Sequence, residues 1–221
     1  MSKENTNALP GQREKSKAKR RAAIIEIAKR SFLEKGYENT SMSAIALEMG
    51  GSKGTLWTYF TSKEELFAAV IENVAAAFQS FTAMALNTEN DTPTVLTRFC
   101  ETFISRISLP EAIAIQRLVV SQAVRAPGLA RIFYDRGPAI NHNMISNYIG
   151  RQMLAGKLRV DDPAEAGKML LDLCTAGYHD HVFYGLKTSD KETEQREAAR
   201  VVKQFMRCYG PDGYENRAEK K

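Results

Sequence analysis

The side chains best suited to specific chemistry in this sequence stand close together in one short segment. Lys53 offers a positive charge, Gly54 permits close approach of the backbone, and Thr55 combines a hydroxyl with a methyl group. Trp57 and Tyr59 carry N–H and O–H donors on large rings. On an exposed helix face, this combination suits hydrogen bonds to base edges near the helix start and to phosphates further along. The segment therefore indicates contact with duplex DNA.

Three short helices joined by tight turns are expected to present these side chains. The first has an apolar stripe at i, i+3, i+4 and i+7, formed by Met42, Ile45, Ala46 and Met49. Thr40 and Ser41 stand where this helix needs an N-cap, because hydroxyls accept hydrogen bonds from the free amides of a first turn. Gly50-Gly51 then breaks the helix, since paired glycines adopt conformations that other residues avoid.

The second helix is expected to carry the candidate side chains on its outer face. Ser52 can cap this helix, while Leu56 and Phe60 form its inner face. Ser62, followed three residues later by Glu65, is a capping box that opens the third helix. The alternative is an ordinary α-domain whose core buries the two aromatic rings.

The distribution of charge favours the DNA-binding interpretation. Residues 1–63 contain 12 Lys and Arg against 6 Asp and Glu, whereas the remaining 158 residues contain 19 against 20. The formal net charge of +5 therefore comes from the part of the chain that holds the candidate segment. A localised positive excess is typical of a surface that binds nucleic acid.

The candidate segment resembles the helix-turn-helix domain of TetR-family transcriptional regulators. The matching positions are Ile24-Ile25, Ala28, Phe32, Gly36-Tyr37, Thr40-Ser41, Ile45-Ala46, Gly50, Ser52-Lys53-Gly54-Thr55-Leu56, Tyr59-Phe60 and Ser62-Lys63-Glu64-Glu65-Leu66. Three positions depart from the family pattern, where a small aliphatic residue, a Tyr and an acid are usual: Gly51, Trp57 and Ala44. The change at Trp57 replaces a phosphate-contacting hydroxyl with an indole N–H.

Nine residues are expected to bind DNA. We expect Lys53 and Thr55 to contact base edges, with Gly54 allowing close approach. The residues expected to hold phosphates are Thr40, Ser41, Trp57, Tyr59 and Lys63. Thr58 could do either. Each protomer of a homodimer would read one half-site of a palindromic operator.

Length and composition favour an all-α protein with a substantial core. The chain has 221 residues, 43% of them hydrophobic, with 7 prolines, 14 glycines and no strand-like alternation. No apolar run reaches the length of a membrane span, and the polar N-terminus lacks the centre of a secretory signal, so we expect a cytoplasmic protein. Cys100, Cys174 and Cys208 are spaced too widely for a disulfide framework or a zinc site.

Four segments are expected along the chain. They are a disordered polar leader over residues 1–16, a helix-turn-helix domain over 17–63, a helical effector-binding and dimerisation domain over 64–209, and a disordered tail over 210–221. About nine helices are expected, and the fourth is long and links the two domains. The segment from Leu129 to Leu154 could bend at Gly137-Pro138.

Basic residues lead directly into the first helix, at Lys15, Lys17, Lys19, Arg20 and Arg21. One interpretation is a solvated helix start. The other is an N-terminal arm that reaches neighbouring phosphates or the minor groove. The sequence leaves both open.

Residues 109–166 resemble the C-terminal domain of AefR-like and AcrR-like members of the same family. The matching runs are Leu109-Pro110-Glu111-Ala112, Gln116-Arg117-Leu118-Val119, Ala126-Pro127-Gly128-Leu129-Ala130, Phe133-Tyr134 and Gly156-Lys157-Leu158-Arg159-Val160-Asp161-Asp162-Pro163. This resemblance implies a helical domain that dimerises through its last two long helices and can hold an effector pocket.

Aromatic and flexible apolar residues of this domain are the candidates for that pocket. They are Phe78, Phe99, Phe103, Phe133, Tyr134, Met144, Tyr148, Met169 and Tyr178. Met and Tyr near helix bends suit an adaptable apolar pocket, whereas each residue taken singly could be plain core. Gln116 and Arg117 could supply polar contacts to an effector or pair on the surface.

Metal and enzyme chemistry are not expected. His179 and His181 stand at i and i+2, so on a helix their imidazoles point to different faces. We expect Tyr178, His179 and Phe183 to pack in a dimer interface instead. The glycine-rich run at residues 50–55 lacks the order of a phosphate-binding loop, and no nucleophile motif is present. No catalytic residue, metal or cofactor is therefore predicted.

The sequence thus predicts a homodimeric DNA-binding repressor that a small, largely apolar effector releases from its operator. The alternative is a non-inducible DNA-binding architectural or cell-division factor on the same scaffold. A helical enzyme with an accessory DNA head would need convergent polar groups in the C-terminal cavity, and the sequence does not display them.

Overall fold

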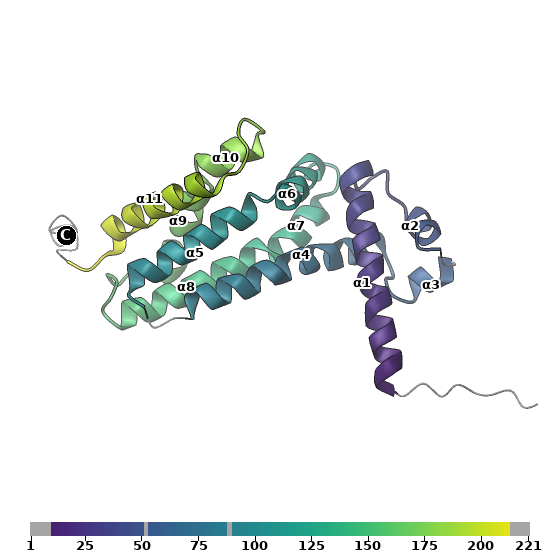
Figure 1. Cartoon of the computed structure of the whole chain (residues 1–221), viewed down its shortest axis with the longest axis horizontal. Coiled ribbons are helices and arrows are strands. Elements are labelled where there is room, and N and C mark those ends of the chain that lie inside the picture. Colours follow the sequence, from purple (N-terminus) through teal and green to yellow (C-terminus); the bar gives the residue numbers. More distant parts are fainter. Residues whose placement is uncertain (1–9, 51–52, 88–89, 213–221) are drawn as a thin grey trace, which may run out of the picture. The chain divides into compact units, whose positions relative to one another are not determined.

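The computed structural model describes residues 10–50, 53–87 and 90–212. Over these ranges the chain forms α-helices and no strand, which confirms the all-α prediction (Figure 1). The helices are α1 (Pro10–Lys35), α2 (Met42–Glu48), α3 (Lys53–Trp57), α4 (Lys63–Leu86), α5 (Thr92–Ile107), α6 (Pro110–Gln122), α7 (Pro127–Arg136), α8 (Pro138–Leu154), α9 (Pro163–Thr175), α10 (Tyr178–Phe183) and α11 (Lys191–Tyr209).

The described part of the chain has eleven helices where about nine were expected. Gly137 separates α7 from α8, so the bend considered within residues 129–154 is a break between two helices. Gly177, at φ +84°, separates the short α10 from α9. A backbone with positive φ ends a helix, and glycine adopts it without steric cost.

The chain divides into two compact units, Met1–Asn73 and Val74–Lys221. We expected the boundary at residues 63 and 64, but the first turns of α4 belong to the first unit. Phe67 explains this difference, because its ring packs edge-on against Phe32 at 5.6 Å and against Tyr37 at 5.5 Å. The first unit therefore needs the start of α4 to complete its core.

The N-terminal leader is shorter than expected. Helix α1 begins at Pro10, so residues 10–16, which were assigned to a disordered leader, are helical. Proline suits the first turn of a helix because its missing N–H has no partner there anyway. Residues 1–9 lie outside the described part, as do residues 213–221 of the expected disordered tail.

In the second unit, α5 packs against α9 and α11, α8 packs against α9, and α6 packs against α7. Helices α5 to α9 each begin with a proline in the first turn, and Asp91, Asp162 and Asp190 cap α5, α9 and α11. The close contact of α8 and α9 depends on Gly167, where an added Cβ would lie 2.4 Å from the Ser146 hydroxyl. Sequence periodicity alone does not reveal that contact.

Helix α4 corrects the expectation that no apolar run reaches the length of a membrane span. Within the described ranges, it is the one helix that is long and apolar enough to cross a membrane by length and composition. The first turns carry Leu66, Phe67 and Val70, which are buried in the first unit. Core helices of soluble proteins pass this test as membrane spans do, so length and composition do not distinguish the two kinds of helix.

Candidate nucleic-acid interface

Helix α3 has a buried face and an exposed face, as the sequence predicts. Leu56 and Phe60, which follows the helix, are completely buried. Trp57 is 49% exposed and Thr58 is exposed, while Tyr59 is half-buried. The two aromatic rings are therefore not sealed in the core, which was the alternative considered for them.

The other expected DNA-binding residues in and after α3 differ in their exposure and in their partners. Gly54 is exposed and Thr55 is half-buried. Lys53 begins α3, but its side chain lies outside the described part, as do Gly51 and Ser52. The Thr58 hydroxyl donates to the Thr55 carbonyl at 2.7 Å. Because its proton is used there, Thr58 faces solvent as an acceptor.

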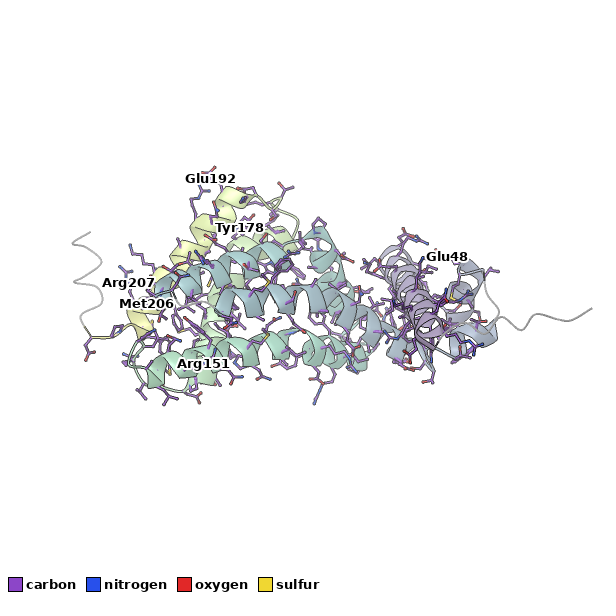
Figure 2. The ribbon with its side chains drawn as sticks, turned by 60° about the horizontal axis from the view of Figure 1, so that its bottom comes forward. Glu48, Arg151, Tyr178, Glu192, Met206 and Arg207 are labelled. Carbon is purple, nitrogen blue, oxygen red and sulfur yellow. The ribbon has the colours of Figure 1, made fainter. Side chains whose placement is uncertain are left out.

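Helix α2 is held by its caps and by α1. The Ser41 hydroxyl accepts from the Ala44 N–H at 3.1 Å, which confirms Ser41 as the N-cap. At the other end, Gly50 has φ +66° and its N–H donates to Leu47 O at 3.0 Å. Glu48, labelled in Figure 2, forms an ion pair with Arg30 of α1. The hydrogen bond from Arg30 lowers the pKa of the Glu48 carboxyl.

Thr40 does not occupy the position expected of a phosphate ligand. It is 1% exposed, and its hydroxyl lies 2.8 Å from the Gly36 carbonyl and 3.0 Å from the Ser31 carbonyl. A hydroxyl has one proton, and both nearby carbonyls compete for it inside the unit. The prediction for the Thr40 side chain is therefore wrong, and its role is to join the turn before α2 to α1.

Lys63 is engaged within the first unit. Its ammonium donates to the carbonyls of Tyr37 at 2.9 Å and Thr40 at 3.1 Å, and it lies 4.1 Å from the centre of the Tyr37 ring. An ammonium has three protons, so one remains for another acceptor. Lys63 fastens the loop before α2 to the start of α4, a role that sequence reasoning missed because its partners are backbone carbonyls 23 and 26 positions away.

The predicted capping box at the start of α4 is present in a slightly shifted form. The Ser62 hydroxyl accepts from the Glu65 N–H at 3.0 Å. The Glu65 carboxylate accepts from both the N–H and the hydroxyl of Thr61, at 2.6 and 2.7 Å. These hydrogen bonds lower the pKa of Glu65. The box fixes the turn that follows α3 and thereby sets the orientation of the exposed face.

The residues proposed for an effector pocket do not gather in one described cavity. Phe78, Phe99 and Phe103 form a ring cluster with centroids 5.5 and 5.8 Å apart. Tyr148 is buried, Phe133 and Met144 are half-buried, and Tyr134 is 53% exposed. The first three rings and Tyr148 are placed as core residues. Tyr134 faces solvent.

Tyr178, Gln116 and Arg117 join α6, α10 and the start of α11. The hydroxyl of Tyr178, a residue labelled in Figure 2, accepts from the Asp190 N–H at 2.8 Å. The Arg117 guanidinium donates to the carbonyls of Phe183 at 2.6 Å and Val182 at 3.2 Å, so it caps the end of α10. Gln116 pairs with the buried ring of His179 at 3.1 Å. These polar groups therefore hold helices together.

The dimer-interface prediction for Tyr178 and His179 is also wrong. Both side chains are buried within the chain itself, whereas Phe183 is half-buried and His181 is exposed. Burial lowers the pKa of His179. Among the described residues, no group of three His, Cys, Asp or Glu could hold a metal ion.

The interior of the second unit contains buried polar atoms that have no hydrogen-bond partner among the described residues. They are Thr82 Oγ1, Ser108 Oγ, Gln122 Oε1, Asn141 Oδ1, Ser146 Oγ and His179 Nδ1. A buried polar atom without a partner costs free energy unless water or a ligand satisfies it. The sequence gives no signal for this set, because exposure and partners follow from packing.

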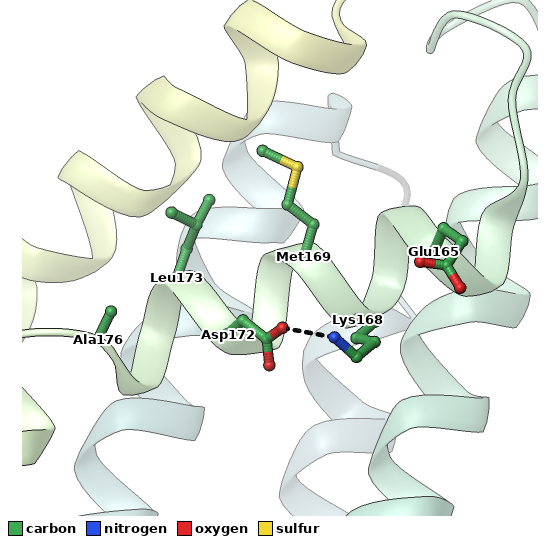
Figure 3. A pocket seen from close by; sticks show the side chains of 6 residues that line it. All are labelled: Glu165, Lys168, Met169, Asp172, Leu173 and Ala176. Atoms are coloured by element: carbon green, nitrogen blue, oxygen red, sulfur yellow. Dashed lines mark hydrogen bonds and ion pairs between the residues drawn. The ribbon is translucent and has the colours of Figure 1, made fainter.

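One pocket of about 300 Å³ lies along α9 (Figure 3). Its lining residues are Glu165, Lys168, Met169, Asp172, Leu173 and Ala176. Lys168 and Asp172 form an ion pair of 3.0 Å across its lower edge. Met169 was expected near an effector, but the other five residues were not singled out, because helical spacing does not show which face of α9 stays uncovered.

The first unit is a three-helix head whose α3 has a polar, partly aromatic face, and a larger helical unit follows it. This arrangement is typical of helix-turn-helix DNA-binding regulators. Residues 24–70 match the model of bacterial regulatory proteins of the tetR family, and residues 94–211 match that of the AefR-like transcriptional repressor C-terminal domain. The second match covers more than half of the chain. The chain therefore belongs to the TetR family of DNA-binding transcriptional regulators, which are not enzymes.

The first curated relatives match over a short part of the chain. YfiR of Bacillus subtilis, an HTH-type transcriptional regulator, is 46% identical over 25% of this chain and 27% of its own length. The chain thus spans about a quarter of the length of the first curated relatives that it matches. The HTH-type transcriptional repressor AcnR of Corynebacterium glutamicum is 25% identical over 76% of this chain and 84% of its own.

Solved structures match over most of the chain. A structure from Mesorhizobium loti assigned to the TetR family superposes with a TM-score of 0.75 at 27% identity, covering 87% of this chain and 98% of its own. The flavonoid-responsive regulator FrrA gives the same TM-score of 0.75 at 28% identity, covering 88% and 99%. These similarities confirm the predicted fold of a helix-turn-helix head followed by a helical domain.

Proposed function

We propose that this chain is a homodimeric repressor that leaves a palindromic operator when a small, largely apolar effector binds. The observation that carries the proposal is the two-sided α3, with Leu56 buried completely and Trp57 49% exposed on the other side. The exposed part of the Trp57 ring is available to contact DNA, and its indole N–H can donate to a phosphate oxygen. The proposed place of action is the cytoplasm, where the operator lies.

The proposed DNA contacts come from α3 and the caps around it. Lys53 and Thr55 would contact base edges, and Gly54 would let the backbone approach. Trp57 and Tyr59 would donate to phosphates, as would the proton of the Ser41 hydroxyl and the third proton of Lys63. Thr58 would act as an acceptor toward a base amino group. Phosphate contacts of this kind set the register, and base contacts set the sequence preference.

The proposed dimer forms through the last two long helices, which are α9 and α11. The uncovered face of α9 that lines the pocket in Figure 3 supports this assignment, because it combines Met169 and Leu173 with the charged pair Lys168–Asp172. Mixed apolar and charged faces are typical of interfaces between soluble subunits. Two heads would then read half-sites about 34–36 Å apart, one turn of the duplex.

The proposed effector binds inside the second unit. Supporting observations are the match to the AefR-like repressor domain and the similarity to FrrA, which responds to flavonoids. Phe78 and Met144, which are partly buried beside the core of the second unit, offer apolar surface, and Thr82 Oγ1 and Asn141 Oδ1 offer polar atoms without a partner among the described residues. The effector releases the operator only if it binds the non-DNA-binding state more tightly.

Selection from random duplexes with the purified protein, followed by footprinting, tests the DNA-binding role. We expect one palindromic sequence to be enriched. Trp57→Ala should weaken binding to it by about ten-fold or more, the loss of roughly 1.4 kcal/mol or above. Tyr184→Ala is the matched control, because Tyr184 is a 70% exposed aromatic residue of the second unit. Enrichment of no sequence, or equal effects of the two variants, would contradict the proposal.

A second candidate function is a DNA-binding factor that needs no effector. The nucleoid occlusion factor SlmA of Pasteurella multocida is 28% identical over 52% of this chain and 50% of its own length. Ligand screening separates the candidates. If no small apolar compound from a broad panel, flavonoids included, dissociates the operator complex, the non-inducible function is favoured.

A further inference from the structure

Helix α1 extends well beyond the part that packs in the head. It begins at Pro10, yet residues 11–23 are all exposed and the first buried residue is Ile24. The match to the tetR family model also begins at residue 24. Residues 10–23, here called the α1 extension, therefore precede both the core of the head and the part shared with the family.

The α1 extension is strongly basic. Its 14 residues contain six Lys and Arg and a single acid, Glu14. Within the described part of the chain, Arg13, Lys17 and Arg20 form no ion pair with a carboxylate. No carboxylate of the described residues therefore compensates these three charges.

The basic residues divide into two faces of the helix. Arg13, Lys17, Arg20 and Arg21 stand at i, i+4, i+7 and i+8, which places them on one face. We call these four residues the basic stripe. The same spacing continues to Ile24 and Ala28, which are buried in the head. Lys15 and Lys19 lie on the opposite face.

The basic stripe faces the side of the head that holds α3. The Arg21 guanidinium lies 5.0 Å from the centre of the Phe60 ring, three residues after the end of α3. Arg21 thus fixes the direction of the stripe relative to the candidate DNA-binding helix within the same compact unit.

Folding does not account for these charges. Positive charges near a helix N-terminus oppose the helix dipole, and α1 has no acidic residue in its first turn. Like charges at i and i+4, such as Arg13 and Lys17, repel each other. Apart from Arg21, which lies over the Phe60 ring, the residues of the stripe are exposed and have no apolar partner among the described residues. A polyanion beside the stripe removes both costs.

We propose that the basic stripe binds phosphates of duplex DNA that flank the half-site read by α3. From Arg13 to Arg21 the stripe spans about 12 Å of helix, while duplex DNA carries one charge per about 1.7 Å of its axis. Several phosphates therefore lie within reach. The site rests on the proposed function, because α3 brings the head to DNA, and it adds binding strength that is independent of sequence.

The test compares two charge-matched double variants of the full-length protein. Arg13→Gln with Lys17→Gln removes two charges from the basic stripe, and Lys15→Gln with Lys19→Gln removes two from the opposite face. Glutamine has a helix propensity close to that of lysine and arginine, so the helix is kept. Binding is measured against salt concentration, on the selected operator and on a random duplex of equal length.

We expect the stripe variant to reduce the slope of log Kobs against log salt by about 1.8, or about 0.9 for each phosphate that is no longer neutralised. The reduction should appear on both duplexes, and the opposite-face variant should change the slope by less than half as much. The charge-preserving exchange Arg13→Lys with Lys17→Arg should bind as the unaltered protein does. Far-UV circular dichroism checks that all variants keep their helix content.

Equal reductions of the salt slope by the stripe variant and the opposite-face variant would overturn the proposal. They would mean that the charges attract DNA at a distance and that the stripe does not bind it directly. Unchanged slopes for the stripe variant would overturn it as well. The proposed function fails separately, if the unaltered protein prefers no sequence over the random duplex. In that case the difference in salt slope between the two double variants, measured on the random duplex, still decides whether the stripe binds phosphates.

Discussion

The two compact units carry their candidate functional groups in opposite places. In the first unit they lie on the surface, where Trp57 is 49% exposed and Thr58 is exposed. In the second unit they lie inside, where Thr82 and Asn141 are nearly fully buried and each has an oxygen without a partner among the described residues. A DNA duplex has to be met by a rigid outer face, whereas a small apolar molecule is best enclosed. The difference follows from the size of what each unit would bind.

Truncating one aromatic residue in each unit is the strongest test of this difference between an exposed and a buried set of groups. Phe99→Ala should cost about 3–5 kcal/mol of unfolding free energy, because Phe99 is completely buried and its ring lies 5.8 Å from that of Phe103. Trp57→Ala should change stability by no more than about 0.5 kcal/mol, as exposed substitutions usually do. Denaturant titration measures both. Similar losses would mean that Trp57 is a core residue after all.

A smaller effect is expected where α8 meets α9. Gly167→Ala should destabilise the second unit by about 1–3 kcal/mol, since the new Cβ would lie 2.4 Å from the Ser146 hydroxyl and 3.3 Å from its backbone. Gly128→Ala is the matched control, because no described atom outside the backbone of its own helix turn lies within 4 Å of a Cβ there. The control should be neutral or slightly stabilising. Thermal unfolding of both variants is the measurement, and a neutral Gly167→Ala would show that the two helices separate easily.

Local signals made the elements of both units predictable from the sequence. Ser41 caps α2 and Ser62 caps the start of α4, both as expected. Each of these features depends on residues a few positions apart. The two faces of α3 follow in the same way from the spacing of its apolar residues.

Contacts between distant residues could not be predicted in this way. Lys63 has the residue type of a phosphate ligand, but its partners are backbone carbonyls that only the folded loop brings near. Arg117 looks suited to a ligand, yet it caps a short helix 65 positions away. Residue type states what a side chain can bind, and tertiary structure decides which partner it has.

The smallest expected effect concerns pH and the buried His179. Burial lowers the pKa of its imidazole in the folded protein, whereas the unfolded chain has the ordinary pKa of about 6.5. The unfolded state therefore binds the proton more readily. The stability from the neutral ring is fully present above about pH 6.5 and is lost as the pH falls below that value.

Unfolding free energies measured from pH 7.5 down to pH 5.5, in steps of about half a unit, test whether stability falls with pH in this direction. His179→Gln should flatten the decline, because glutamine does not titrate and can still pair with Gln116. His181→Gln should leave the decline unchanged, since His181 is exposed. If both variants kept the slope of the unaltered protein, His179 would be free to protonate in place. The interior of the second unit would then be more open to water than its unpartnered buried polar atoms indicate.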